Sequence, residues 1–296
     1  MGLYGGIELG GTKVACMVAE GPEHIVAEER FVTTTPDETI HQVIRFFKQQ
    51  NERQTLSAIG VGSFGPLELN KESKNFGYIT STPKAGWQNY DLLGVLKSAL
   101  NLPIVLDTDV NAAAFGELCW GNGKGKDPFV YITVGTGIGM GGWINGKLMH
   151  GLTHPEAGHI LLQRDDQDAS YRGGCPFHQN CWEGLASGTA IFRRWGQRAE
   201  TLAPDHPAWK LETDYISQAL VNLILTLSPR RIVLGGGVMQ QDHLFPSIRL
   251  RVVELLNGYI QAKEILENTE LFILPPALGQ RAGVLGSVAL AIHPDQ

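Results

Sequence analysis

The sequence predicts an α/β protein built from two related domains, on three observations. Short apolar runs typical of buried strands alternate with amphipathic segments typical of helices. A unit of strand, glycine/threonine turn and strand occurs twice, at residues 4–19 and 129–149. The length of 296 residues suits one large domain or two of ordinary size. Because the repeat spacing exceeds that of any solenoid, two domains facing a cleft are favoured over a repeat array.

The first domain begins with strands at residues 4–9 and 14–19, joined by the turn Gly10-Gly11-Thr12-Lys13. Thr35-Pro36-Asp37-Glu38 is a helix start signal, with a capping residue, a proline and two acids in order. An apolar stripe follows at helical spacing: Ile40, Val43, Ile44 and Phe47. Apolar runs at 57–62 and 104–106 indicate buried strands, and the second leads into a helix at 112–114.

The second domain repeats the opening plan of the first. A strand at 129–134 precedes the turn Gly135-Thr136-Gly137-Ile138-Gly139, and a further strand reaches the turn signal Asn145-Gly146. An amphipathic helix is predicted over 214–227, and a buried strand at 231–234 ends in Gly235-Gly236-Gly237.

The final helix, at residues 281–292, is predicted to return to the first domain. We therefore expect an N-terminal lobe of residues 1–115, joined by 281–296, and a C-terminal lobe of residues 116–280. A linker rich in proline or serine is missing from the sequence, so the lobes should meet directly.

Composition narrows the class of protein. The chain is 43% hydrophobic and 18% charged, enough for a sizeable core. A net charge of -6 without a basic run excludes nucleic acid as an expected partner. The N-terminus lacks the pattern of a signal peptide, and the most apolar segment, near 220–227, is too short to span a bilayer. We expect a soluble cytoplasmic protein, in which Cys16 and Cys119 fill core space.

The glycine-rich turns suggest phosphate binding of an uncommon kind. Gly10-Gly11-Thr12-Lys13 is not a Walker A loop, because the lysine follows the threonine and a strand follows the turn. Gly137, Gly139 and Gly142 match a dinucleotide fingerprint formally, but a strand again follows where a helix is required. Each turn could be merely a turn. Three such turns after strands are better explained by a nucleotide whose phosphates meet backbone amides and the hydroxyls of Thr12 and Thr136.

Two aspartates follow the strand at 104–106. Either Asp107 or Asp109 could simply cap the next helix, and for Asp107 the two interpretations are evenly balanced. Asp109 stands at the carboxyl end of a strand, where open α/β sheets bind ligands. A carboxylate there could accept the proton of a hydroxyl that attacks a γ-phosphate, and Asn111 could orient that acceptor. The residues thus point to phosphoryl transfer from a nucleotide to a polar acceptor.

Four nitrogen and sulfur ligands lie within a short stretch. His159, Cys175, His178 and Cys181 are of zinc type, two imidazoles and two thiolates. A disulfide between the cysteines, or two inert thiols, is the alternative, and a cytoplasmic setting disfavours the disulfide. Four protein ligands leave no position on the zinc for a water molecule, so we expect the metal to be structural. It would fix the loop at 160–182 and so orient Glu156 and Glu183. His154 has no assigned role.

Six motifs, taken together, resemble those of the ROK sugar kinases in their order along nearly the whole chain. They are Gly10–Lys13, Gly62–Pro66, Asp109–Ala113, Gly135–Gly139, Glu156–His159 and Gly235–Val238. The segment Ser81–Trp87 and the form of the metal loop are similar to the zinc-containing bacterial fructokinase branch. The resemblance implies a two-lobed actin/hexokinase-type ATPase fold, with ribonuclease-H-like lobes that close over ATP and sugar.

The same resemblance implies roles for single residues. Asp109 would be the general base, and the sugar hydroxyls would be held by Gly65, Asn111, Glu156, His159 and Glu183. Thr12 and Thr136 would face the phosphates, and Gly235, Gly236 and Gly237 would line the adenosine site. Lys13 would reach a phosphate or remain a solvated turn lysine. Glu8 stands where many members carry aspartate, and a role near Mg²⁺, through water, is implied for it.

The expected activity is ATP-dependent phosphorylation of a hexose, with the 6-hydroxyl of fructose as first choice. Glucose or mannose is the nearest alternative, because a few hydroxyl contacts decide between them. A sugar-responsive regulator is the different class that remains, but the phosphate loop begins by Gly10 and leaves no room for a DNA-binding domain. A catalytically dead sugar-binding protein is disfavoured by intact loops and Asp109. Family resemblance favours a homodimer.

Overall fold

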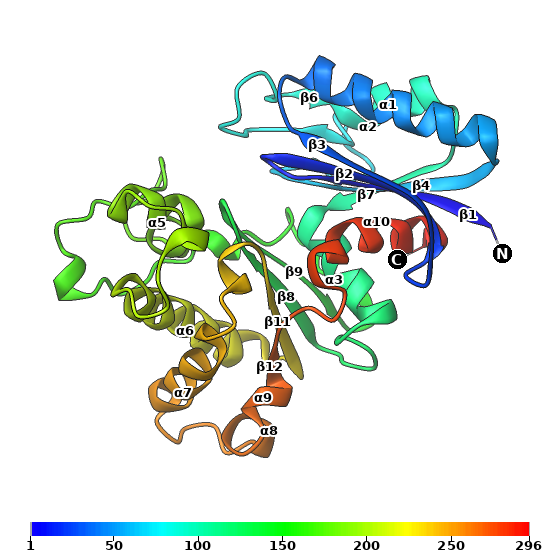
Figure 1. Ribbon diagram of the computed structural model, residues 1–296. Helices are drawn as coiled ribbons and strands as arrows, with labels where there is room; N and C mark the ends of the chain where they lie inside the picture. The colour runs from blue at the N-terminus through cyan, green and yellow to red at the C-terminus, as the bar shows by residue number, and fades with distance from the viewer. Residues whose placement is uncertain (1, 296) are drawn as a thin grey trace. The chain divides into compact units, whose positions relative to one another are not determined.

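The computed structural model describes residues 2–295, which form two compact units (Figure 1). The first unit contains the chain up to Gly125, then Gly141–Pro155 and the chain from Ala277 onward. The second unit contains Lys126–Met140 and Glu156–Pro276.

These limits differ from the predicted lobes of 1–115 and 116–280 in two segments. Residues 116–125 belong to the first unit, and so does a later segment. Residues 141–155, predicted for the C-terminal lobe, belong to the first unit. Part of the reason is the side chain of Asn111, which accepts from the amide of Gly142 and donates to the carbonyl of Met149. Trp143 and Leu148 also pack in the apolar cluster around Phe115. Such contacts join distant parts of the chain and have no local signature.

The first unit is built on a five-stranded sheet with the order β3-β2-β1-β4-β7. β1 (Leu3–Leu9) and β2 (Lys13–Gly21) are antiparallel and joined by the predicted turn, and β3 (His24–Val32) continues the meander. β4 (Leu56–Ser63) and β7 (Ile104–Thr108) then add in parallel, so the carboxyl ends of β1, β4 and β7 lie at one edge. β5 (Tyr78–Ile79) and β6 (Tyr90–Asp91) form a small separate ribbon.

Helices cover both faces of this sheet, as Figure 1 shows. α1 (Pro36–Arg53) begins at the cap Thr35, as predicted, and packs with α2 (Leu92–Leu100) on one face. α10 (Ala282–Ile292) and α3 (Asp109–Trp120) lie on the other face. The alternation of β2 explains both layers, because Val14, Cys16 and Val18 join the α1 core while the residues between them meet α10.

α10 approaches the sheet unusually closely. A Cβ atom at Gly60 would collide with the backbone carbonyl of Ser287, so glycine is required there. The hydroxyl of Ser287 donates to the carbonyl of Ile7 at 2.8 Å and accepts from the amide of Gly62 at 3.1 Å. The final helix therefore packs on the first sheet, and its Ser287 side chain hydrogen-bonds to two of the strands.

The carboxylate of Glu117 organises the places where the chain leaves and re-enters the first unit. This fully buried side chain in α3 accepts from the amide of Asn122 at 2.7 Å, before the exit. It also accepts from the amides of Ala277 and Leu278, at 3.2 and 2.8 Å, after the return. One carboxylate thus satisfies backbone groups of both connections.

The second unit contains most of a second five-stranded sheet, in the order β10-β9-β8-β11-β12. Its strands are β8 (Phe129–Val134), β9 (Ile138–Ile144), β10 (Lys147–Leu148), β11 (Arg231–Gly235) and β12 (Ile273–Leu274). β9 passes from the second unit into the first between Met140 and Gly141. β8, β11 and β12 are parallel, which brings the loops after β8 and β11 to the same edge.

The helices of the second unit precede and follow β11. They are α4 (Trp182–Ala186), α5 (Gly188–Trp195), α6 (Ala208–Leu227), α7 (Leu244–Leu256), α8 (Lys263–Leu266) and α9 (Thr269–Phe272). α6 contains the predicted helix 214–227 but begins earlier, and it packs side by side with α7 (Figure 1). In residues 2–295, none of the helices has both the length and the apolar character needed to cross a bilayer.

Candidate active site and metal centre

The first phosphate loop, Gly10–Lys13, is a tight turn with its carbonyl groups engaged. The amide of Gly10 donates to the carbonyl of Lys13 at 3.0 Å, which closes the turn. Thr33 holds it from β3's end, because its hydroxyl donates to the carbonyl of Gly10 and its amide to that of Thr12. Gly11 and Thr12 are exposed at the tip, where a ligand can reach them.

Asp109 is the first residue of α3, directly after β7. Thr108 caps this helix, since its hydroxyl accepts from the amide of Asn111 at 3.1 Å, so Asp109 is not needed as the cap. Desolvation raises the pKa of Asp109 to about 6, although its own neighbouring amide, Val110, donates to it. A carboxylate with such a pKa is suited to accept a proton near neutral pH.

Glu8 forms a carboxylate pair with Asp109 at the edge of the first sheet. Burial, and then the charge of Asp109, raise the pKa of Glu8 to about 7. Gly283 at the start of α10 makes room for it, because a Cβ there would collide with the Glu8 carboxylate. Two mutually repelling carboxylates are oxygen donors of the kind that Mg²⁺ takes in small number beside phosphates. The donor set therefore fits magnesium.

Asn111 is completely buried, and both the nitrogen and the oxygen of its side-chain amide are hydrogen-bonded. Its nitrogen donates to Asp107 at 2.9 Å and to the carbonyl of Met149 at 3.2 Å, and its oxygen accepts from Gly142 at 3.1 Å. In this structure Asn111 joins the end of β7 to the segments around Gly142 and Met149.

His150 and His154, to which the sequence analysis gave no role, lie near Asp107 and Gly65. Nε2 of His150 lies 2.9 Å from Oδ2 of Asp107, and that carboxylate raises the pKa of His150. Nε2 of His154 accepts from the amide of Leu67 at 3.0 Å and lies against Gly65, whose Cβ would be 3.1 Å from the ring. His154 thus fixes the loop that carries Gly65, and burial lowers its pKa.

The second phosphate loop, Gly135–Gly139, is held by α4 and α5. The carboxylate of Glu183 accepts from the amide of Ile138 at 2.9 Å. The amide of Gly188 donates to the carbonyl of Gly135, and the hydroxyl of Thr189 to that of Thr136, both at 2.7 Å. Glu183, expected at the sugar, is therefore also bonded to the phosphate loop.

The third glycine cluster lies beside the second loop. Gly236 has a φ of +91°, and a Cβ there would meet the backbone of Val134. A Cβ on Gly135 would be 3.9 Å from the amide nitrogen of Gly237. Both clusters follow adjacent parallel strands, so the second unit brings together the residues predicted to bind phosphate and adenosine.

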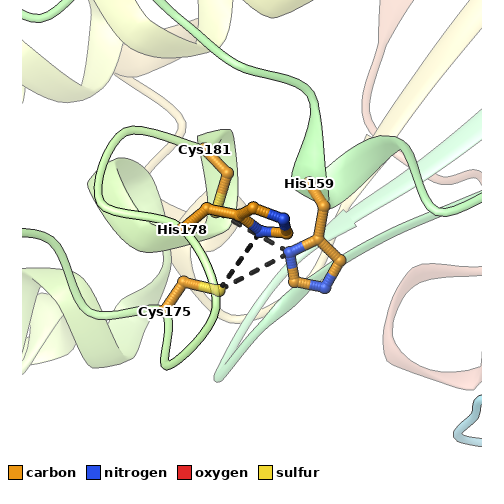
Figure 2. Close-up of side chains that lie close together, drawn as sticks. All are labelled: His159, Cys175, His178 and Cys181. Atoms are coloured by element: carbon orange, nitrogen blue, oxygen red, sulfur yellow. Dashed lines mark hydrogen bonds between the residues drawn. The ribbon is translucent and has the colours of Figure 1, made fainter.

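The four predicted metal ligands converge, as Figure 2 shows. Their ligand atoms all lie within 4.8 Å of one another. Sγ of Cys175 is 3.7 Å from Nδ1 of both His159 and His178, and Sγ of Cys181 is 3.7 Å from Nδ1 of His159. Ligands around one tetrahedral zinc are about 3.6 Å apart. Both cysteines are free thiols, which removes the disulfide alternative, and the donor set fits zinc.

The loop that carries these ligands is anchored by a buried ion pair that sequence reasoning missed. Arg194 on α5 binds both carboxylate oxygens of Asp168 at 2.9 Å, and the hydroxyl of Tyr215 donates to Asp168 at 2.8 Å. Arg193 donates to the carbonyl of Gly174. α5 therefore fixes the metal loop at one end and the second phosphate loop at the other.

Within each unit the structure brings most of the predicted residues together. Asp109 lies with Glu8 in the first unit, and Glu183 lies with the second loop in the second unit. Glu156 is exposed and begins the turn Ala157–His159, whose amide at His159 donates to the Glu156 carbonyl at 2.9 Å. His150, Glu117 and Arg194 had no sequence signal, because each acts on a partner far away in the chain.

Two glycine/threonine turns after strands, a desolvated carboxylate pair and a His/Cys tetrad are the features that we expect of a phosphoryl transferase. The model of the ROK family matches residues 4–293, and the chain belongs to this family.

Named relatives extend this result. A putative fructokinase of Bacillus subtilis (strain 168) is 47% identical over 98% of this chain and 95% of its own length. A fructokinase of Zymomonas mobilis is 42% identical over 98% of this chain and 96% of its own. The structure of a ROK glucokinase from Streptomyces griseus with glucose and AMPPNP matches with a TM-score of 0.80 at 25% identity, covering 98% and 99% of the two chains. The predicted fold class is confirmed.

Proposed function

We propose that the protein is an ATP-dependent hexose kinase, a fructokinase that phosphorylates the 6-hydroxyl of D-fructose. One observation carries the choice of sugar: identity is 47% and 42% to proteins named as fructokinases but 28% to proteins named as glucokinases. Differences of this size across nearly full-length matches favour the branch that shares more of its sequence.

Asp109 would act as the general base. Its carboxylate accepts the proton of the 6-hydroxyl as that oxygen attacks the γ-phosphorus. The bond from this phosphorus to the bridging oxygen of ADP breaks, so ADP leaves with the electron pair. Desolvation, which raises the pKa of Asp109, makes this carboxylate a stronger base than an exposed aspartate.

The phosphates would be held by backbone amides and hydroxyls. Gly10, Gly11, Thr12 and Lys13 would serve in the first unit, and Gly135, Thr136 and Gly137 in the second. Gly235, Gly236 and Gly237 would line the adenosine site. Mg²⁺, when bound with the nucleotide, would neutralise charge on the transferred phosphate. Glu8 would hold it through water, since the carboxylate pair attracts a cation.

The sugar hydroxyls would be contacted by Gly65, Asn111, Glu156, His159 and Glu183. Zinc on His159, Cys175, His178 and Cys181 would be structural, because four protein ligands complete a tetrahedral shell. It would hold the segment after Glu156 against the start of α4, where Glu183 stands. The anchoring of this loop by Asp168 and Arg194 supports that assignment.

Assays of ADP release across fructose, glucose and mannose test the proposal. We expect the highest kcat/KM with fructose and a product that carries phosphate on carbon 6, detected by phosphorus–proton NMR coupling. A comparable kcat/KM for glucose or mannose would contradict the choice of fructose. Sugar binding without ADP release for any hexose would instead favour the sugar-responsive regulator.

We also propose a cytoplasmic homodimer. A zinc site with two thiolates suits a reducing compartment, and family resemblance favours two copies. Light scattering coupled to size exclusion measures the mass directly. A mass near that of one chain, 32.3 kDa, at micromolar concentration would contradict the dimer.

A further inference from the structure

Every carbonyl group of the first phosphate loop has a hydrogen-bond donor. Those of Gly10, Thr12 and Lys13 accept from Thr33 or from within the turn. The fourth, that of Gly11, accepts from Nζ of Lys84 at 2.5 Å. Because carbonyl oxygens repel phosphate, fixing all four on donors removes them from the ligand's path.

Two backbone amides at the tip of the same loop are free. Among residues 2–295, the amides of Gly11 and Thr12 make no hydrogen bond, and both residues are exposed. A Cβ at Gly11 would meet nothing within 4 Å. The tip of the loop therefore offers donors and open space, the combination that binds phosphate oxygens.

Lys84 is held in place by its own segment. This segment, residues 81–87, connects β5 and β6 and is anchored by the buried Trp87, whose indole donates to the carbonyl of Thr34 at 2.9 Å. The amide of Trp87 also donates to the carbonyl of Lys84 at 3.1 Å, which closes a turn over the lysine. The backbone of Lys84 is therefore fixed, and its side chain points at the loop.

The ammonium group of Lys84 lacks an anionic partner. Across residues 2–295 it forms no ion pair, and its bond to Gly11 uses one of its three N–H donors. Desolvation lowers its pKa, as expected for a cation partly withdrawn from water without a carboxylate beside it. Lys13, by contrast, is exposed.

We propose that Lys84 is a phosphate-binding residue of this site: its ammonium contacts the terminal phosphate of the nucleotide, beside the free amides of Gly11 and Thr12. The inference rests on the proposed kinase function and adds a residue to it. The resting bond to Gly11 keeps the cation at the loop before the nucleotide arrives.

Calorimetric titration with the non-hydrolysable analogue AMPPNP and with AMP tests this without turnover. We expect Lys84→Met to weaken AMPPNP binding at least about tenfold while AMP binding is unchanged, because AMP lacks the outer phosphates. Lys84→Arg should recover most of the loss. Lys74→Met, which removes an exposed lysine from the loop between β4 and β5, is the control and should bind both ligands normally.

The salt dependence of AMPPNP binding shows whether Lys84 contacts the phosphate through its charge or only stabilises the loop. Removal of a cation that touches phosphate should flatten the plot of log Kd for AMPPNP against log salt concentration. Thr33→Val, which removes a neutral donor to the same loop, should weaken AMPPNP binding but leave that slope unchanged.

Two results would overturn the inference: equal AMPPNP affinity in Lys84→Met and the unaltered protein, or weaker binding with an unchanged salt slope. Failure of the unaltered protein to bind AMPPNP at all would be a different outcome. It would contradict the kinase function itself, and this inference with it.

Discussion

At the scale of single residues, the carboxylate pair Glu8–Asp109 links the proposed catalytic base to the stability of the fold. Each group is desolvated, and the charge of Asp109 raises the pKa of Glu8 further. The folded protein therefore holds these protons more tightly than the unfolded chain. Their contribution to stability falls as pH rises from the ordinary carboxyl range toward 6–7. The pair is maintained for chemistry at a cost in folding free energy.

Replacing the base should separate these two effects. Asp109→Asn is expected to lower kcat by about 10²–10⁴-fold and to leave fructose affinity largely intact. Because it removes one of two repelling carboxylates, it should also raise the free energy of unfolding at pH 8, on the order of 1 kcal/mol. Steady-state kinetics and thermal melting measure the two effects. Unchanged turnover would remove Asp109 as the base.

The pH dependence of activity gives a second test at this scale. Asp109, with a pKa of about 6, must be ionised to accept a proton. We expect kcat/KM to decline below an apparent pKa near 6, with a slope approaching tenfold per pH unit. Circular dichroism over the same range controls for acid unfolding. An acid limb at pH 4, the range of an exposed carboxyl, would contradict a desolvated base.

The position of Asp109 at the end of a strand was predictable because it is a local feature of the sequence. It could not identify the partners of Asn111, which come from residues about 30 to 40 positions later. His154 lacked a role for the same reason, since Leu67 is 87 residues away. Residues defined by position were predictable, whereas residues defined by tertiary hydrogen bonds were not.

At the scale of elements, the metal loop between Ile160 and Cys181 has little regular structure of its own. It forms a single bridge, Leu161 with Cys181, and a short turn of 3₁₀-helix at Asp166–Asp168. The contacts that hold it include the His/Cys tetrad, the Asp168–Arg194 pair and hydrogen bonds between Gln163 and Gln218. The tetrad was predictable from ligand spacing, while the ion pair required the fold.

Loss of the metal should therefore loosen this loop. Complete chelation is expected to lower the melting temperature by several degrees, and fructose affinity should fall with it. The reason is that Glu156 and Glu183 flank the released segment. Calorimetry before and after chelation measures both, and added zinc should restore them while magnesium should not. An unchanged melting temperature and activity after verified metal removal would contradict a structural zinc.

At the scale of the whole molecule, motifs along the chain predicted the fold class. The boundaries of the two units were harder to predict from the sequence. Strands and helices with periodic patterns, such as α1 and β8, were placed correctly. Residues 141–155 follow the second loop in sequence, yet they belong to the first unit through Asn111. The hydrophobic pattern of a segment predicts its local structure. The unit to which the segment belongs depends instead on the residues against which it packs.

The packing of α10 on the first sheet predicts a sharp sensitivity to size. Gly60→Ala should destabilise the protein by roughly 3 kcal/mol, because the new Cβ collides with the backbone at Ser287 rather than with a side chain that could move. Gly151→Ala, whose Cβ would be 3.6 Å from the nearest atom, is the control and should melt normally. Denaturant titration measures both, and equal midpoints would refute the close contact.

The hydroxyl of Ser287 bonds to both β1 and β4, but Ser287 lies near the end of the chain. These bonds can therefore form only late in synthesis. A ribosome completes β1, β4 and β7 and then the whole second unit before α10 is made. Until that late segment is made, the part of this face that α10 covers stays exposed. A nascent chain of this protein therefore exposes apolar surface for most of its translation, and it is during this interval that a chaperone would have the most to protect.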